Sequence, residues 1–245
     1  MDETLVISIR ERYERVLAQI ADAAHRSGNA PARLVVVSKA QPLEVVRAAI
    51  QAGVQVFGEN YAEEAVEKIA ALGEVAVEWH MIGHVQSRKA ALVAEHFDMV
   101  HSLDSLKLAA RLERFCAEKD RTLPVLLEMN VSGEASKFGF PAWDENNWPD
   151  LVPLLAQFEQ FSHLKVRGLM TMPPYFEDAQ QARPYFQRLR RLRDFLAKSL
   201  PVFDWLELSM GTSTDFVVAV EEGATLVRIG QAILGPRPKR MEESG

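Results

Sequence analysis

The feature that most constrains the fold is an alternation of short apolar segments with longer amphipathic segments along almost the whole chain. Eight apolar segments are predicted as buried strands, at 34–38, 54–57, 78–82, 98–102, 125–130, 164–170, 204–209 and 225–229. Apolar strands joined by amphipathic helices are typical of a parallel sheet covered by helices. Eight such units in about 250 residues favour one closed (β/α)8 barrel, a TIM barrel, over an open doubly wound sheet. We expect a single domain over 1–245, with a barrel core at about 30–237.

Helices are predicted between these strands, and an extra helix is predicted before the first of them. Apolar residues recur at helical spacing from Ile9 to Ile20, which indicates this N-terminal helix. Asp104 is expected to cap the helix that follows the fourth strand, because aspartate is a preferred N-cap residue. The longest stretch expected to be irregular is 131–148, after the fifth strand.

The charge and cysteine content exclude several classes of function. The formal net charge is −6 at pH 7, whereas proteins that bind nucleic acid or anionic membranes present a basic face. The single cysteine, Cys116, cannot form an intrachain disulfide, and the six histidines show no metal-ligand spacing. The first residues do not resemble a signal peptide, and no apolar run is long enough to span a membrane. We therefore expect a cytoplasmic protein that binds no metal, no nucleic acid and no membrane.

Two loops near the end of the chain carry the clearest chemical signal, because active sites of (β/α)8 barrels lie at the carboxyl ends of the strands. Ser209, Gly211 and Ser213 follow the seventh predicted strand, and Gly230 and Gln231 follow the eighth. Loops at these two places often bind phosphate through backbone N–H groups at helix starts. Each loop alone is explained as well by turn and cap chemistry, but together they predict a phosphate site.

Lys39 is expected at the carboxyl end of the first strand, inside the mouth of the barrel. Burial there lowers the pKa of a lysine and makes its neutral amine available to attack an aldehyde. A lysine beside a phosphate site fits either a pyridoxal 5′-phosphate (PLP) site or an aldolase acting on a sugar phosphate. Arg228, on the eighth strand, would face the pyridine nitrogen of PLP, bind a substrate phosphate, or pair with an inner carboxylate such as Glu207.

Seven short motifs occur in order along the chain and carry a resemblance to a known family. They are VVSK at 36–39, FGENY at 57–61, HMIGHVQ at 80–86, SKFG at 136–139, RGLM at 167–170, LSMG at 208–211 and VRIG at 227–230. In this set and order the chain resembles the YggS/PROSC family of PLP-binding proteins, also called PLP homeostasis proteins. The resemblance covers about 34–235, which is nearly the whole chain.

The resemblance implies a monomeric barrel related to the N-terminal domain of bacterial alanine racemase, with PLP held as an internal aldimine on Lys39. It implies that Ser209, Gly230 and Gln231 hold the phosphate, and that Arg228 faces the pyridine nitrogen. An arginine at that place leaves the nitrogen unprotonated and weakens the cofactor as an electron sink. The family usually has threonine where this chain has Gln231, so one hydroxyl contact to the phosphate is expected to be lost.

Further pocket residues are expected from the same matching. Asn60, Asn130 and Met170 match pocket-lining positions, and Lys137 matches a lysine in a loop near the cofactor. Gly211 belongs to the phosphate loop, and Ser213 and His84 complete the set of candidate pocket residues.

The family resemblance implies storage, carriage or buffering of PLP, with effects on amino-acid and keto-acid balance and with PLP-dependent enzymes as clients. No catalytic residue and no robust catalytic activity are expected. Alanine racemase takes its second acid/base from an added domain, for which this chain is expected to have no room. The alternatives are a weak PLP-dependent racemase or lyase using His84, Lys137 or Tyr61 as second acid/base, a sugar-phosphate aldolase or isomerase, and an interaction scaffold.

Overall fold

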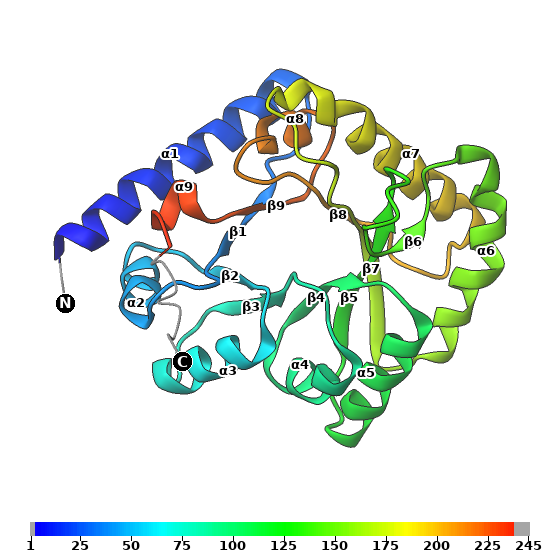
Figure 1. The fold of residues 1–245 in the computed structure, drawn as a ribbon, viewed down its shortest axis with the longest axis horizontal. Helices are drawn as coiled ribbons and strands as arrows, with labels where there is room; N and C mark the ends of the chain where they lie inside the picture. The colour runs from blue at the N-terminus through cyan, green and yellow to red at the C-terminus, as the bar shows by residue number, and fades with distance from the viewer. Residues whose placement is uncertain (1–2, 238–245) are drawn as a thin grey trace, which may run out of the picture.

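Eight parallel strands close into a barrel in the computed structural model, which describes residues 3–237 (Figure 1). The barrel strands are β1 (Arg33–Val37), β2 (Val56–Glu59), β3 (Glu78–Met81), β4 (Met99–Leu103), β5 (Leu123–Asn130), β7 (Leu164–Met170), β8 (Glu207–Ser209) and β9 (Leu226–Ile229). Each of them pairs in parallel with the next, and β9 pairs with β1, which closes the sheet. The predicted TIM barrel is therefore confirmed.

Helices surround the barrel on the outside, as the amphipathic segments predicted. They are α2 (Leu43–Gln51), α3 (Ala62–Leu72), α4 (Ala90–His96), α5 (Leu106–Glu118), α6 (Trp148–Ala156), α7 (Arg183–Ser199), α8 (Phe216–Glu221) and α9 (Gln231–Leu234). Short 3-10 helices are η1 (Ser87–Lys89), η2 (Glu145–Asn147), η3 (Gln157–Gln160) and η4 (Ala179–Ala182). Over the described residues, no helix combines the length and the apolar character needed to cross a membrane.

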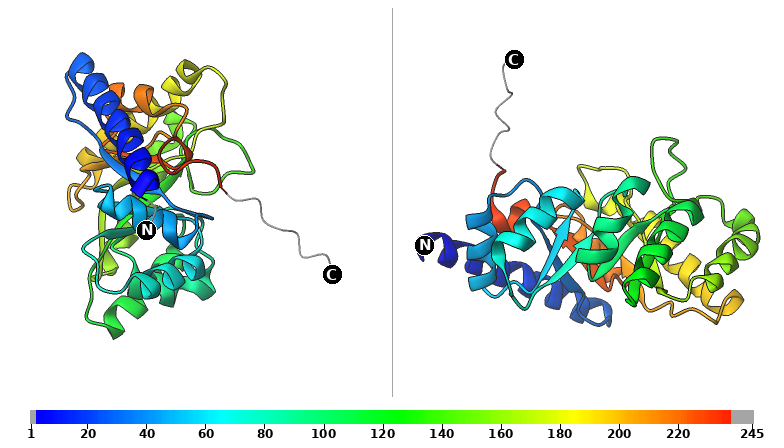
Figure 2. Two further views of the ribbon diagram at one scale, coloured as in Figure 1. Left: turned by 90° about the vertical axis from the view of Figure 1, so that its left-hand side faces the viewer. Right: turned by 90° about the horizontal axis from the view of Figure 1, so that it is seen from below.

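The predicted N-terminal helix is present as α1 (Glu3–Ser27), and it lies along the outside of the molecule (Figure 2). Its apolar face buries Ile9, Val16 and Ile20, and it contacts α2, α8 and α9. This contact lays α1 over the place where the first and last strands of the barrel meet (Figure 1).

Two local predictions were wrong. The N-cap of α5 is Ser105 rather than Asp104, because the helix begins one residue later and the Ser105 side chain accepts from the Leu108 N–H at 3.3 Å. The stretch at 131–148 is not wholly irregular, since β6 (Phe140–Pro141) pairs in parallel with the end of β5. Both differences lie at the mouth side of the barrel, where loop contacts decide the conformation.

The interior of the barrel is closed by a small apolar cluster at mid-height. Its members are Val35, Val56, Met99, Leu126, Met170 and Leu226. Most other apolar side chains pack between the strands and the helices. The upper end of the barrel is therefore a pocket with a floor, and the side chains that follow the strands form its walls.

Candidate functional site

A cavity of about 400 Å³ opens at the carboxyl ends of the barrel strands. The predicted site residues that line it are Lys39, Asn60, His84, Lys137, Ser213, Arg228, Gly230 and Gln231. They come from the ends of β1, β2, β3, β8 and β9 and from the loop after β5. The fold therefore gathers residues from distant parts of the chain around one space.

The other predicted site residues lie close by but do not line this cavity. Asn130 organises the loop after β5, because its Oδ1 accepts from the Gly133 N–H at 3.0 Å. Met170 belongs to the apolar floor. Gly211, with φ at +92°, brings the loop after β8 against α8, where a Cβ would lie 2.5 Å from that of Ala219. Their roles as cofactor contacts remain predictions.

Ser209 is also absent from the cavity wall, and its side chain is fully buried below it. Its hydroxyl oxygen accepts a hydrogen bond from Arg228 and lies 2.8 Å from His101 Nδ1. Ser213, four residues further along the chain, does line the cavity. Of the two serines predicted near the phosphate, Ser213 is thus the one whose side chain borders the space a ligand would occupy.

Lys39 stands two residues beyond β1 and is half-buried at the cavity wall. Burial lowers the pKa of its amine, the nearby positive charge of Arg237 lowers it further, and Glu59 opposes both effects. None of the described residues accepts a hydrogen bond from its Nζ. A larger fraction of this amine than of an ordinary lysine is therefore neutral and available to a carbonyl carbon.

The backbone on both sides of Lys39 is held by a buried ion cluster between the ends of β1 and β2 and the helix α3. Lys68 Nζ donates to the Ser38 carbonyl oxygen and to Glu64 Oε1, each at 2.7 Å. The same Glu64 oxygen accepts from the Ala40 N–H at 2.6 Å. The two residues flanking Lys39 are thus tied to one cluster on α3. The sequence carried no signal for it, because Lys68 reads as a solvated helix lysine.

Glu59 is the buried centre of this cluster. Its Oε1 accepts from Lys68 at 2.7 Å and from the Ser38 hydroxyl at 2.8 Å, and its side chain is fully buried. Burial raises the pKa of this carboxyl, although Lys68 opposes the shift. Its second oxygen, Oε2, is buried without a partner. The carboxylate therefore depends on Lys68 for most of its charge compensation.

Arg228 brings a guanidinium to the cavity from an almost fully buried position on β9, the strand that pairs with β1. Its Nη2 donates to the Thr171 carbonyl oxygen at 2.9 Å and contacts Met172 Sδ at 2.8 Å. Burial lowers the pKa of Arg228 to about 10, so the group stays charged at neutral pH. The alternative pairing with Glu207 is not present, since that carboxylate accepts from Thr225.

Glu128 is a cavity residue that the sequence analysis missed. It lies on β5 two residues before Asn130, so strand alternation would have placed it on the same face. Burial raises the pKa of its carboxyl to about 7, and the negative charge of Asp104 adds to the increase, whereas Arg228 and Lys137 oppose it. The cavity therefore contains a carboxyl group that changes protonation state near neutral pH.

The rim of the cavity is built from loops after β3 and β5. The His84 ring stacks on the Phe138 ring, with centroids 3.9 Å apart and planes 12° apart. His84 Nδ1 also lies 2.9 Å from Asp104 Oδ2, which is the contact this aspartate makes instead of a helix cap. Lys137 Nζ reaches the Pro173 carbonyl oxygen at 3.4 Å. The side chains of His84 and Lys137 are thus both held by contacts with other residues of the rim.

Gly230 permits the closest backbone approach at the wall between the first and last strands. A Cβ at this residue would lie 2.9 Å from the Val37 carbonyl oxygen. Gly230 also precedes α9, which begins at Gln231, and both residues face the cavity. A side chain at Gly230 would push the two strand ends apart, so glycine keeps this wall tight and free of a side chain.

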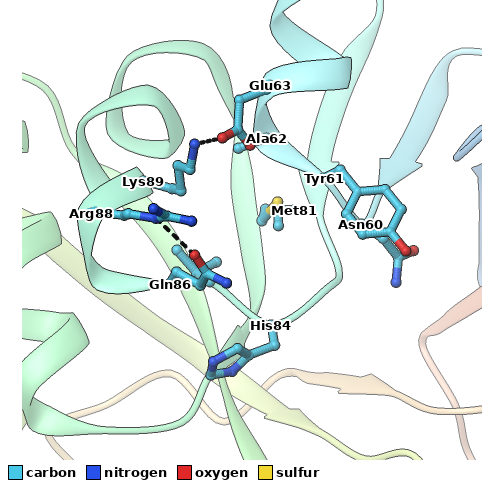
Figure 3. Close-up of a pocket in the computed structure, with 10 residues that line it drawn as sticks. Asn60, Tyr61, Ala62, Glu63, Met81, His84, Gln86, Arg88 and Lys89 are labelled. Carbon is cyan, nitrogen blue, oxygen red and sulfur yellow. Dashed lines mark hydrogen bonds and ion pairs between the residues drawn. The ribbon is translucent and has the colours of Figure 1, made fainter. Parts of the chain in front are cut away.

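A second cavity of about 330 Å³ lies beside the first, between the start of α3 and η1 (Figure 3). Its lining includes Asn60, Tyr61, Glu63, Met81, His84, Gln86, Arg88 and Lys89. Lys89 pairs with Glu63 across it, as the dashed line in Figure 3 marks. Asn60 and His84 line both cavities, so the two spaces adjoin. Within residues 3–237 no group of three His, Cys, Asp or Glu side chains is placed to hold a metal ion.

Comparison with known proteins gives consistent family matches. The family described as "Alanine racemase, N-terminal domain" matches residues 12–238. The pyridoxal phosphate homeostasis protein of Vibrio cholerae is 41% identical over 236 residues, which cover 94% of this chain and 97% of that protein. The protein of the same name from Aquifex aeolicus is 41% identical over 229 residues, covering 93% and 97%.

Solved structures give the same result for the fold. The structure of PipY from Synechococcus elongatus with PLP bound superposes with a TM-score of 0.80 at 34% identity, covering 93% of this chain and all of that chain. Alanine racemase from Bartonella henselae has a TM-score of 0.65 at 18% identity and covers 95% of this chain and 61% of its own. At that identity the second likeness concerns the fold alone.

Proposed function

Because this chain belongs to the alanine racemase N-terminal domain family and, within it, to the pyridoxal phosphate homeostasis proteins, we propose that it binds PLP and serves PLP homeostasis. The observation that carries the proposal is the placement of Lys39 and Arg228 on one cavity of about 400 Å³. That volume is within the range of small-molecule sites. We propose Lys39 as the residue that binds the cofactor covalently.

The residues present fit PLP at the reactive end. PLP supplies an aldehyde that condenses with a neutral amine, and an aromatic ring that withdraws electrons from the bond so formed. Burial is the main cause that lowers the pKa of Lys39. The hydrogen bond from Lys68 Nζ to the Ser38 carbonyl oxygen fixes the backbone from which the Lys39 side chain extends. This arrangement supports a lysine that is both reactive and held in position.

Other residues of the cavity wall fit the ring and the phosphate. Arg228, held by Thr171 and Met172, is proposed to face the pyridine nitrogen. Because an arginine only donates hydrogen bonds, it favours an unprotonated nitrogen and a weak electron sink. Ser213 and the residues Gly230 and Gln231 are proposed to hold the phosphate, with Gln231 contributing its backbone rather than a hydroxyl.

A role in storage, carriage or buffering of PLP agrees better with this site than efficient catalysis does. Two-sided proton transfer at an α-carbon needs a second acid/base opposite the lysine. Three residues were candidates for that role. His84 stacks on Phe138 and contacts Asp104, and Lys137 donates to the Pro173 carbonyl oxygen at 3.4 Å. Tyr61 is half-exposed in the neighbouring cavity. We propose that the protein is a cytoplasmic monomer of one domain and that PLP-dependent enzymes are its clients.

The proposal is tested by reducing the protein with borohydride in the presence of PLP and mapping the labelled peptide by mass spectrometry. We expect a pyridoxyl adduct on Lys39, lost in Lys39→Ala and retained in Lys107→Ala, which removes an exposed lysine on α5. Circular dichroism should show the same fold in all three proteins. An adduct at another lysine, or no adduct in the wild-type protein, would overturn the proposed function.

A further inference from the structure

A continuous chain of polar contacts runs through the interior of the barrel, from the amino-terminal end of β3 to the mouth cavity. Glu78 Oε2 lies 3.2 Å from His80 Nε2, and His80 Nδ1 lies 3.0 Å from His101 Nε2. His101 Nδ1 lies 2.8 Å from Ser209 Oγ, which accepts a hydrogen bond from Arg228. Glu78 is half-exposed at one end of this chain, and Arg228 borders the cavity at the other.

These side chains are an exception in the packing of this barrel. The interior of a (β/α)8 barrel is normally filled with branched apolar side chains, and here the floor of the cavity follows that rule. His80, His101 and Ser209 are nonetheless fully buried. Buried polar atoms cost free energy unless they are hydrogen-bonded, and each ring nitrogen of the two histidines has a partner.

The carboxylate at one end fixes where the protons of the two rings must lie. A carboxylate only accepts, so His80 Nε2 must carry a proton and donate it to Glu78. A neutral His80 then has an accepting Nδ1, which requires His101 to donate from Nε2. A neutral His101 in turn has an accepting Nδ1, which requires the hydroxyl of Ser209 to donate to it.

The arginine at the other end independently requires the same directions. Arg228 only donates, so the Ser209 oxygen must accept from it and the Ser209 proton must point elsewhere. The partner within reach of that proton is His101 Nδ1. Every bond in the chain therefore runs one way, from Arg228 to Glu78, and no donor faces a donor.

The surroundings of both histidines favour the neutral rings that the contacts require. Burial lowers the pKa of each ring, and for His101 the nearby charges of His80, Arg228 and Arg33 lower the pKa further. Around His80, Glu78 and Asp98 oppose the shift, whereas Arg33 adds to it. These shifts agree with the proton directions that the hydrogen-bond partners require.

We infer that His80 and His101 are positioning residues that fix the Ser209 hydroxyl away from the cavity and thereby hold the Arg228 guanidinium at the cavity wall. Ser209 then has no proton to donate to a phosphate, so of the two serines predicted near the phosphate Ser213 is the one able to do so. The role of Arg228 toward the pyridine ring rests on the proposed function, whereas the proton directions in the chain do not.

The proton directions are tested in the protein without cofactor, by two-bond ¹H–¹⁵N correlation spectra of the histidine rings. We expect His80 and His101 each to be neutral with the proton on Nε2 from pH 6 to 8, the range around the ordinary histidine pKa of about 6.5. A proton on Nδ1 of either ring, or a doubly protonated ring, would overturn the inference.

Two serine variants test the link to Arg228. Ser209→Ala should move the ¹⁵N resonance of His101 Nδ1 downfield, because the nitrogen loses its donor, and should weaken PLP binding by about five-fold, as expected for one hydrogen bond. Ser102→Ala is the matched control: this buried serine adjoins His101 in the chain but donates to the Gly83 carbonyl oxygen. It should change neither quantity.

Equal effects in the two variants, or none in Ser209→Ala, would contradict the positioning role. If the wild-type protein fails to bind PLP, the proposed function is wrong, and the ring spectra still decide the proton directions.

Discussion

Replacing Lys68 by methionine tests whether the buried ion cluster between α3 and the ends of β1 and β2 supports both the fold and Lys39. The Lys68 side chain is 8% exposed, and its Nζ makes three hydrogen bonds of 2.7 Å, to Ser38, Glu59 and Glu64. Methionine keeps much of the apolar volume but leaves the fully buried Glu59 without its cation. Breaking a buried pair in this way costs about 3–5 kcal/mol.

The expected result is a loss of about 3–5 kcal/mol in the free energy of unfolding in urea, with a melting temperature lower by roughly 10 °C for a chain of this size. The pH dependence has a definite sign. The pKa of Glu59 is already raised by burial, and losing Lys68 removes the largest opposing effect, so the pKa rises further. A carboxyl whose folded pKa is raised loses stability as pH rises above its unfolded value, so the deficit should be larger at pH 8 than at pH 5.

Two further variants complete this test. Glu59→Gln combined with Lys68→Met removes the uncompensated charge and should recover part of the lost stability at pH 8. Lys107→Met, at an exposed lysine of α5, should unfold within about 0.5 kcal/mol of the wild-type protein. A loss below about 1 kcal/mol in Lys68→Met, or the same loss at pH 5 and pH 8, would show that Lys68 does not compensate the buried Glu59 charge.

Three other predictions follow from named contacts. Burial raises the pKa of Glu128 to about 7, so the wild-type protein should lose about 2–3 kcal/mol of stability relative to Glu128→Gln between pH 5 and pH 8. Urea unfolding at the two pH values measures this loss, and parallel pH profiles would contradict it. Gly230→Ala places a Cβ 2.9 Å from the Val37 carbonyl oxygen and should lower the free energy of unfolding by about 1–3 kcal/mol. It should also weaken PLP binding in a fluorescence titration, and an unchanged affinity would argue against this wall as the phosphate site. Ser105→Ala removes the N-cap of α5 and should lower the free energy of unfolding by about 1 kcal/mol, measured by thermal unfolding. Asp104→Ala leaves this cap intact and should not cause the same loss of helix stability.

The fold could be predicted because its signal is repeated along the whole chain. Each barrel strand is a short apolar run, and the following helix has one apolar face, so an error in one element does not change the architecture. Lys39 and Arg228 could be placed for a similar reason, since parallel strands put their carboxyl ends at one end of the barrel. These predictions depended on position in the fold and not on side-chain contacts.

The ion cluster around Lys68 and the polar chain in the barrel could not be predicted, because both depend on contacts between residues of different elements. Lys68 has the sequence context of a solvated helix residue, and only the packing of α3 against the end of β1 brings its Nζ to the Ser38 carbonyl oxygen. Ser209 and His101 are 108 residues apart. A strand pattern identifies the face on which each side chain lies, but not its hydrogen-bond partner.

Glu128 could have been predicted as a cavity residue from the strand pattern alone. It shares a strand face with Asn130, and the period-two alternation of β5 places both toward the mouth. The structure places Glu128 in the cavity and turns Asn130 to its own loop. The amide of Asn130 finds backbone partners within a few residues, and this local competition is not visible in the strand pattern.

A crystal structure of the protein with PLP tests most directly whether Lys39 binds the cofactor covalently in the mouth cavity. We expect continuous electron density from Lys39 Nζ to the carbon that was the aldehyde of PLP, with the pyridine nitrogen facing Arg228 and the phosphate beside Ser213 and Gly230. Density for PLP elsewhere, or a Lys39 side chain directed into solvent while the cavity stays empty, would contradict it.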